Sequence, residues 1–349
     1  MQSEIAEKVA VELKTQLLDS EKQTLEKKPT ENIEAYSSFL RGRKLLREDS
    51  EASVRQALSL FEKAIELDPS FAKAYVCVAG CHDWLSNSGG EPYDISLPHV
   101  ESSLTHAIDL DPDLPKAHAM LSAMFFSVDD MPGMEAEARR ALELNPSLPD
   151  PYAMLSELAA LKGDTAEMVR QSETAYRLDP IRPRFIWHVG LMYLYAGREE
   201  EALEHWRKTE QLAPAFTYRG MTEYYLSKGD LEKAKEFYAK FEKLEPGPPR
   251  ATSQGGVIAA LEGDREKALV AVKRIEDAKI GPLGFNYIAY IYHALGDLHS
   301  YFESMNKAIE THALIPSTLM YSRLLAGARA DPRYVELMEK IRRQLGLTK

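Results

Sequence analysis

The sequence has few cysteines, no long hydrophobic run and no recognisable export signal. Two cysteines among 349 residues cannot form a disulfide framework. The longest apolar stretch, from Phe185 to Ala196, includes a histidine and is too short to cross a bilayer, so we expect no membrane insertion. The first residues lack the basic start and apolar core of a secretory signal, which favours a cytoplasmic location.

Positive charge is also scarce. Acidic residues outnumber basic ones by 54 to 43, which gives a formal net charge of −11. A surface this negative repels a phosphate backbone, because nucleic-acid binding depends on Lys and Arg side chains that release counterions. We therefore expect no nucleic-acid partner and no attraction to an anionic membrane.

Motifs that carry enzyme chemistry are missing. The chain has no phosphate-binding loop, dinucleotide fingerprint, zinc-protease motif or nucleophile elbow. Cys77 and Cys81 lie one helical turn apart, but no second pair completes a four-ligand zinc site, so we interpret them as buried hydrophobes. His188, His205 and His293 have no paired carboxylate in an arrangement that would suggest a catalytic base, and they are expected to be packed or to line a groove. We predict no catalytic residue, no metal site and no cofactor.

A repeat dominates what the sequence does contain. The segment FEKAIELDP, which ends at Pro69, recurs in altered form along the chain. The prolines that end these segments are separated by 43, 34, 34, 34 and 32 residues, and three consecutive steps of 34 are hard to obtain by chance. They are Pro69, Pro112, Pro146, Pro180, Pro214 and Pro246.

A second mark, a glycine followed by a polar residue, lies between these prolines and continues beyond Pro246. Glycine closes one helix in a left-handed conformation, and aspartate caps the next helix by accepting hydrogen bonds from its first amides. Proline then ends the second helix. Each unit is therefore predicted to be a helix A, a tight turn and a helix B, and we count eight units. The marks are Gly163-Asp164, Gly197-Arg198, Gly229-Asp230, Gly263-Asp264 and Gly296-Asp297.

Side-chain size follows the same register. With the proline as position 32, position 8 is usually small, because two helices whose axes are about 8–10 Å apart leave room only for small residues. Tyr224 at position 8 and Tyr301 at position 20 depart from the pattern. The small residues are Ala79, Ser122, Ser156, Gly190, Gly256 and Ala289.

Two units and both ends differ from the rest. The first unit has a longer connection around residues 47–50, and the second inserts nine residues in segment 86–92, which we predict to be a surface loop, either a partner contact or a neutral insertion. Residues 2–28 have the pattern of an amphipathic helix. Asp331-Pro332 is expected to start a final helix with a polar outer face.

The 34-residue helix–turn–helix unit resembles the tetratricopeptide repeat. The resemblance implies an all-α, right-handed superhelical solenoid of about eight repeats. We divide the chain into an N-terminal amphipathic helix and linker (1–31), the repeat solenoid (32–330) and a C-terminal capping helix (331–349).

A closer resemblance concerns three segments and the end of the chain. Residues 4–9, 35–43 and 57–75, together with Asp331–Tyr334, are similar to the C-terminal repeat regions of bacterial and archaeal multidomain regulators. In these proteins a cyclase, kinase or winged-helix domain is followed by a TolB-like domain and then by the repeats. The resemblance implies a regulatory or signalling setting. The chain is then either a fragment of such a regulator or a stand-alone relative.

In tetratricopeptide proteins, one face of each helix A lines a concave groove. Projected onto this sequence, that face is rich in Trp, Tyr, Arg and Met, the residue types of binding hot spots. Its arginines would hold an acidic motif. Some of these side chains would instead lie in the core between repeats if the register is shifted by one. The chaperone-type carboxylate clamp is absent. The groove residues are Met120, Phe126, Met154, Arg184, Trp187, His188, Leu191, Tyr195, Arg219, Arg250, Tyr287 and Tyr290.

These observations predict a non-enzymatic scaffold that binds a peptide or partner domain, favouring an acidic one, in its concave groove. The alternative is an oligomerisation module that self-associates through residues 2–18 or through an end repeat.

Overall fold

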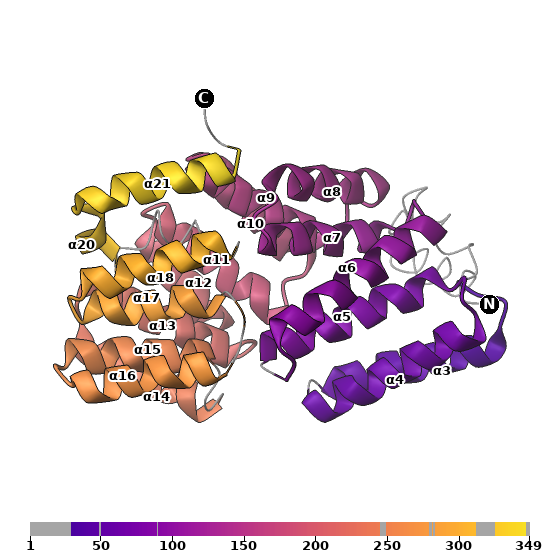
Figure 1. Cartoon of the computed structure of the whole chain (residues 1–349), viewed down its shortest axis with the longest axis horizontal. Helices are drawn as coiled ribbons and strands as arrows, with labels where there is room; N and C mark the ends of the chain where they lie inside the picture. Colours follow the sequence, from indigo (N-terminus) through magenta and orange to yellow (C-terminus); the bar gives the residue numbers. More distant parts are fainter. Residues whose placement is uncertain are drawn as a thin grey trace.

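The computed structural model describes residues 29–48, 50–88, 90–244, 249–278, 281, 283–311 and 325–346. These residues form eight consecutive pairs of antiparallel helices followed by two more helices, and the described part contains no strand. The all-α solenoid predicted from the repeat is confirmed (Figure 1). The N-terminal amphipathic segment lies outside the described residues, and the proposed domain boundaries remain predictions.

The pairs follow the chain in order, with helix A first. The bounds are α3 Ile33–Leu45 and α4 Glu51–Leu67; α5 Ala72–Ser88 and α6 Tyr93–Leu110; α7 Pro115–Ser127 and α8 Met131–Leu144; α9 Pro149–Leu161 and α10 Thr165–Leu178; α11 Pro183–Tyr195 and α12 Glu199–Thr209; α13 Pro214–Lys228 and α14 Leu231–Leu244; α15 Pro249–Leu261 and α16 Arg265–Asp277; α17 Leu283–Ala294 and α18 Leu298–Glu310; then α20 Ala326–Arg329 and α21 Pro332–Gln344.

The turns within the pairs have the predicted chemistry. The five marked glycines have φ between 72° and 84°, a left-handed conformation that only glycine adopts without strain. The aspartate that follows then caps helix B: the Asp164 carboxylate accepts from the amide of Glu167 at 2.9 Å, and Asp264 accepts from that of Lys267 at 3.0 Å. The turn prediction is confirmed. Pro214 differs from the expected stop, because it begins α13 instead of following α12.

Small residues at position 8 let helix A approach helix B, as expected. All six are buried. Two of them are serines that make the same bond 34 residues apart: the Ser122 hydroxyl donates to the Met134 carbonyl at 2.9 Å, and the Ser156 hydroxyl donates to that of Met168 at 2.7 Å. Of the two residues that break the pattern, Tyr301 is fully buried and Tyr224 is half-buried.

The insertion in the second unit does not form the predicted surface loop. Helix α5 continues to Ser88 and α6 begins at Tyr93, so most of the added residues lengthen the two helices. The connection is held in place: the Glu91 carboxylate contacts Nδ1 of His82 at 2.7 Å and accepts from the Ser96 hydroxyl at 2.5 Å. In the first unit, the longer connection contains the short 3₁₀ helix η1, Leu46–Glu48.

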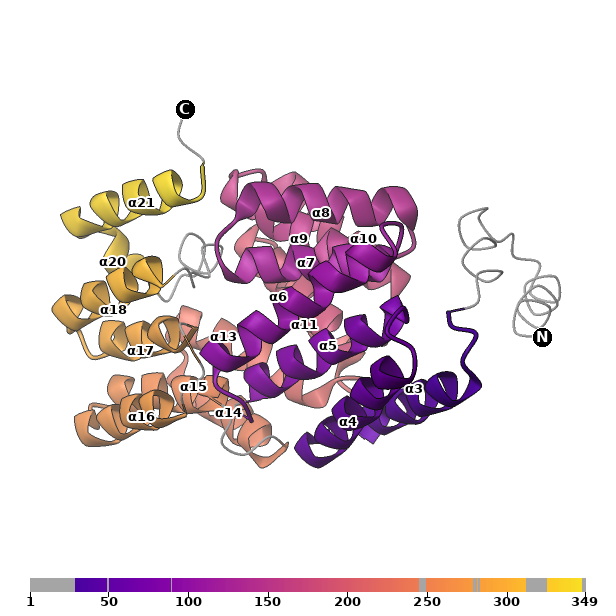
Figure 2. The ribbon, with the colours of Figure 1, turned by 45° about the vertical axis from the view of Figure 1, so that its right-hand side comes forward.

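The pairs stack along a curved path, so that the early and late repeats lie on opposite sides of the molecule (Figures 1 and 2). The last helix, α21, begins at Pro332 after the N-cap Asp331 and buries Leu337, Met338 and Ile341. One hydrophobic cluster includes residues of α21 and of α8, which are separated by five helix pairs in sequence.

We predict that Gly190→Ala destabilises the protein by about 1–3 kcal/mol, the usual cost of overpacking. A Cβ at Gly190 would lie far inside van der Waals contact with the indole of Trp206, which is fully buried and unable to move aside. The matched control is Gly80→Ala, where the nearest atom is Met120 Cε at 3.6 Å. Thermal unfolding should show no loss for the control, because alanine is the better helix former. Equal stability of Gly190→Ala and Gly80→Ala would contradict the close approach of Gly190 to the indole of Trp206.

Candidate functional site

A stacked pair of side chains lies at the centre of the row of A helices. The guanidinium carbon of Arg219, on α13, lies 3.9 Å from the ring centroid of Trp187, on α11. Both residues are half-buried. The amide of Gln254, on α15, donates to the Arg219 carbonyl at 3.1 Å and so joins a third A helix to the pair. Three successive repeats therefore contribute one residue each to this surface.

Carboxylates accompany the cations on the same face. Nε2 of His188 lies 3.1 Å from Glu157, which belongs to the preceding repeat. The Arg182 guanidinium donates to Asp150 at 2.9 Å, and Arg184 lies 3.9 Å from the same carboxylate. The surface therefore carries neighbouring groups of opposite charge.

Two further carboxylates lie on A helices of this row, Asp83 on α5 and Glu223 on α13. The Tyr195 hydroxyl donates to Glu223, and Arg219 is close; burial nevertheless raises the pKa of Glu223. Asp83 on α5 is accessible to solvent. Desolvation by the surrounding protein raises the pKa of its carboxyl, whereas the positive charge of Arg184 on α11 lowers it. Helices α5 and α11 belong to repeats three apart, and the pairs between them stack along the curved path of the solenoid (Figures 1 and 2). The row of A helices is therefore curved.

The structure divides the predicted groove residues into three groups. Arg184 is exposed, and six others are half-buried on the A helices. Four are buried, so the expectation that they present their side chains on the open groove is wrong. Leu191 and Tyr195 pack against α9 and α10, and Met154 lies in a core cluster with Phe185. The side chain of Arg250 lies outside the described residues. The half-buried residues are Met120, Phe126, Trp187, Arg219, Tyr287 and Tyr290, and the fourth buried residue is His188.

The buried residues were misplaced because adjacent A helices pack against each other through part of the projected face. Side chains at these positions are covered by the neighbouring repeat before they reach the groove. The sequence analysis also missed Asp83, Glu223 and Gln254. Glu223 had a usable signal, since it follows Arg219 by four residues on one helix face. The assignment of the accessible residues to partner binding remains a prediction.

The remaining chemistry is limited. Burial raises the pKa of the Cys81 thiol to about 12, so this sulfur stays protonated and unreactive at neutral pH. No group of three or more His, Cys, Asp or Glu side chains in the described part of the chain could hold a metal ion. Among the described helices, none is long and apolar enough to cross a membrane.

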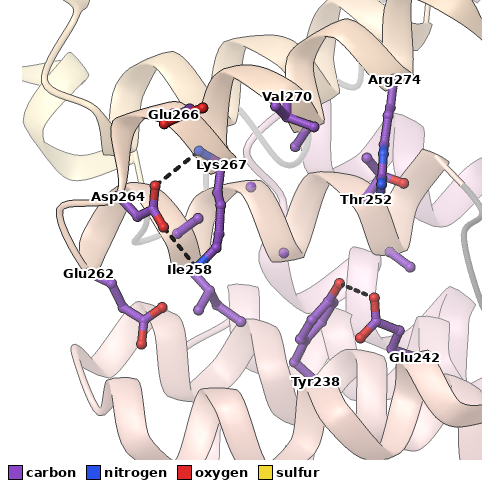
Figure 3. A pocket seen from close by; sticks show the side chains of 15 residues that line it. Tyr238, Glu242, Thr252, Ile258, Glu262, Asp264, Glu266, Lys267, Val270 and Arg274 are labelled. Atoms are coloured by element: carbon purple, nitrogen blue, oxygen red, sulfur yellow. Dashed lines mark hydrogen bonds and ion pairs between the residues drawn. The ribbon is translucent and has the colours of Figure 1, made fainter.

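A separate pocket of about 620 Å³ lies between α14 and α16, over α15 (Figure 3). At one end, the Tyr238 hydroxyl donates to Glu242 at 3.0 Å, and at the other Lys267 lies 2.8 Å from Asp264. The floor is made of small residues such as Gly255. The pocket does not include the Trp187–Arg219 pair.

The comparisons with known proteins give one family match and several structural likenesses. The family model described as tetratricopeptide repeat matches residues 223–248. No curated protein sequence matches the chain. The solved structure of the human IFIT1 dimer with m7Gppp-AAAA is 14% identical, covering 88% of this chain and 76% of that one, with a TM-score of 0.57. At this identity the likeness concerns the fold alone.

Two bacterial structures match over shorter stretches. PilF of Pseudomonas aeruginosa is 19% identical, with 63% of this chain and 96% of that one covered and a TM-score of 0.43. A tetratricopeptide protein of Thermus thermophilus is 16% identical, with 59% and 98% covered and a TM-score of 0.44.

We predict that Glu223→Gln raises the melting temperature above pH 7. A carboxyl whose pKa is raised on folding costs stability wherever it is ionised in the folded protein, and this cost disappears below the unfolded value of 4.5. The gain should therefore shrink as the pH falls toward 4.5. Thermal unfolding between pH 4 and 8 measures it, with Glu200→Gln on an exposed site of α12 as the control. A lower melting temperature at pH 8 would show that the bonds to Glu223 outweigh its desolvation.

Proposed function

We propose that this chain is a non-enzymatic interaction scaffold that binds a peptide or a partner domain on the concave face of α9, α11, α13 and α15. The observation that carries the proposal is the stacked pair of Trp187 and Arg219 at the centre of this face. Tryptophan and arginine are enriched among the residues that dominate binding energy at interfaces. A repeat solenoid presents such a face as an extended surface of fixed curvature.

The charges on the face limit the partner. Arg184 lies 3.9 Å from Asp150, and Arg219 lies near Glu223, so an acidic peptide would have to compete with carboxylates that are already beside these arginines. A peptide that carries both acidic and basic side chains can pair its acidic groups with the arginines and its basic groups with the carboxylates. We therefore favour a peptide of mixed charge over the uniformly acidic one expected from the arginines alone.

The same carboxylates argue against RNA as the ligand. The IFIT1 structure contains a capped oligoribonucleotide, and this chain shares the fold. Here, however, Asp83, Glu157 and Glu223 lie on the A helices of a protein whose net charge is −11. Phosphates placed there would meet repulsion instead of a basic surface.

The setting of the proposed interaction rests on the sequence. The similarity to repeat regions of multidomain regulators supports a regulatory or signalling role inside the cell. Self-association through residues 2–18 lies outside the described residues and remains the alternative. Sedimentation of the full chain and of a chain lacking residues 1–28 tests this alternative. If residues 2–18 hold copies of the chain together, the truncation lowers the mass to that of a monomer; otherwise both chains sediment in the same state.

We predict that Trp187→Ala weakens binding of peptides selected on the wild-type protein from a phage-displayed random library by roughly 30-fold. The reason is that truncation of a hot-spot residue costs about 2 kcal/mol or more. Arg219→Glu should lose the same peptides, since it reverses the charge that stacks on the indole. Fluorescence anisotropy with labelled peptides gives the affinities.

The control is Arg207→Glu, which makes the same change of charge at an exposed position of α12, the B helix of the same repeat as Trp187. It should bind the selected peptides like the wild type. Selected peptides that bind Trp187→Ala and Arg219→Glu with unchanged affinity would place the binding surface elsewhere.

A further inference from the structure

The turn of the third repeat differs from the other turns of the solenoid. Its left-handed position is occupied by Asp129, with φ of 58°, where the next five repeats have glycine. Those five glycines are exposed, whereas Asp129 is 4% exposed. An aspartate here costs backbone strain that glycine avoids, and it adds a carboxylate that glycine lacks. Something therefore covers this one turn and contacts its side chain.

The covering element is the C-terminal helix. The side-chain amide of Gln344, the last residue of α21, donates to the Asp129 carboxylate at 2.9 Å and to the Ile309 carbonyl at 3.0 Å. One amide thus joins repeat eight to repeat three, across 215 residues of sequence. Leu345 and Ile341 are buried in the same hydrophobic cluster as Met131, the first residue of α8. Figure 1 shows α21 extending from α20 toward this part of the molecule.

A second contact closes the same side of the superhelix. Gly281, in the connection between α16 and α17, lies so close to Tyr93 that any Cβ would overlap its side chain. The Tyr93 hydroxyl lies 3.3 Å from the Ser127 carbonyl, at the end of α7. Burial raises the pKa of the Tyr93 hydroxyl, and the negative charges of Asp129 and Asp83 raise it further.

We infer that α21 is a latch that closes the superhelix onto the turn of repeat three and controls access to the concave groove. The control of access rests on the function proposed above, whereas the latch itself does not. The latch joins α21 to repeat three through the bond between Gln344 and Asp129 and through the apolar contact of Ile341 and Leu345 in the cluster that includes Met131. The helix pairs, in contrast, are packed along their whole length. Release of α21 therefore leaves the repeats folded and opens the superhelix.

The deciding variant is Asp129→Gly. Glycine suits the left-handed turn and removes the acceptor of the Gln344 bond. If Asp129 served only as a turn residue, its replacement by glycine would stabilise the protein. For a latch, amide hydrogen exchange in α21 should rise at least tenfold and the radius of gyration from small-angle scattering should increase, while the melting temperature of the solenoid is maintained. Unchanged exchange in α21 and an unchanged radius would overturn the latch.

Two further variants separate the latch from loss of folding. Asp129→Asn keeps an acceptor for Gln344 and should exchange like the wild type. Gln344→Glu places a second carboxylate beside Asp129 and should open the latch more than Asp129→Gly does. Its control is Glu339→Gln on the exposed side of α21, which should have no effect. If Gln344→Glu and Glu339→Gln behave alike, the contact does not hold α21.

The control of access is tested with the peptides selected on the wild type. Asp129→Gly should bind them at a faster association rate, because an open superhelix admits them without prior release of α21. If α21 is released but the association rate of the peptides is unchanged, α21 does not control access, and the proposal that the groove binds peptides still stands. If the groove is not the binding surface, Trp187→Ala will instead bind the selected peptides with unchanged affinity.

Discussion

The close contact between helices at small residues is the constraint on which the rest of this structure depends. The indole of Trp206 lies against Gly190 on α11 and Gly220 on α13, where any Cβ would overlap it. This one ring therefore sets the separation of two successive A helices. Trp187 is one helical turn before Gly190, and Arg219 immediately precedes Gly220. The stacking of Arg219 on Trp187 is thus a consequence of core packing, and the candidate site shares its geometry with the hydrophobic interior.

Repetition explains why the candidate binding surface has no local motif in the sequence. Polar contacts recur at the repeat length: Ser253 donates to the Tyr287 carbonyl, 34 residues away, and Arg182 pairs with Asp150, 32 residues away. Each repeat contributes one or two side chains, and the surface exists only when successive repeats are stacked. A function distributed in this way appears in the sequence as composition on one helical face, without a local signature.

The features that could be predicted are those set within one unit. Gly163 and Asp164 determine their turn by backbone conformation and capping, and the serine at 156 meets helix B within its own repeat. The positions of Leu191 and Tyr195 could not be predicted, because a small rotation of α11 decides whether they face the groove or the neighbouring repeat. The segment from Ser86 to Ser88 was misjudged for a related reason: its composition favours a loop, but the packed α5 extends through it.

The closure changes how the solenoid should be understood physically. In an open solenoid each repeat contacts only its neighbours, so the end repeats fray and the curvature of the groove can vary. Here Gln344 and Asp129 join the last helix to the third repeat, and Gly281 meets Tyr93 on the same side. A change of curvature anywhere between repeats three and eight must then strain or break these contacts. These contacts therefore couple the shape of the groove to the position of α21.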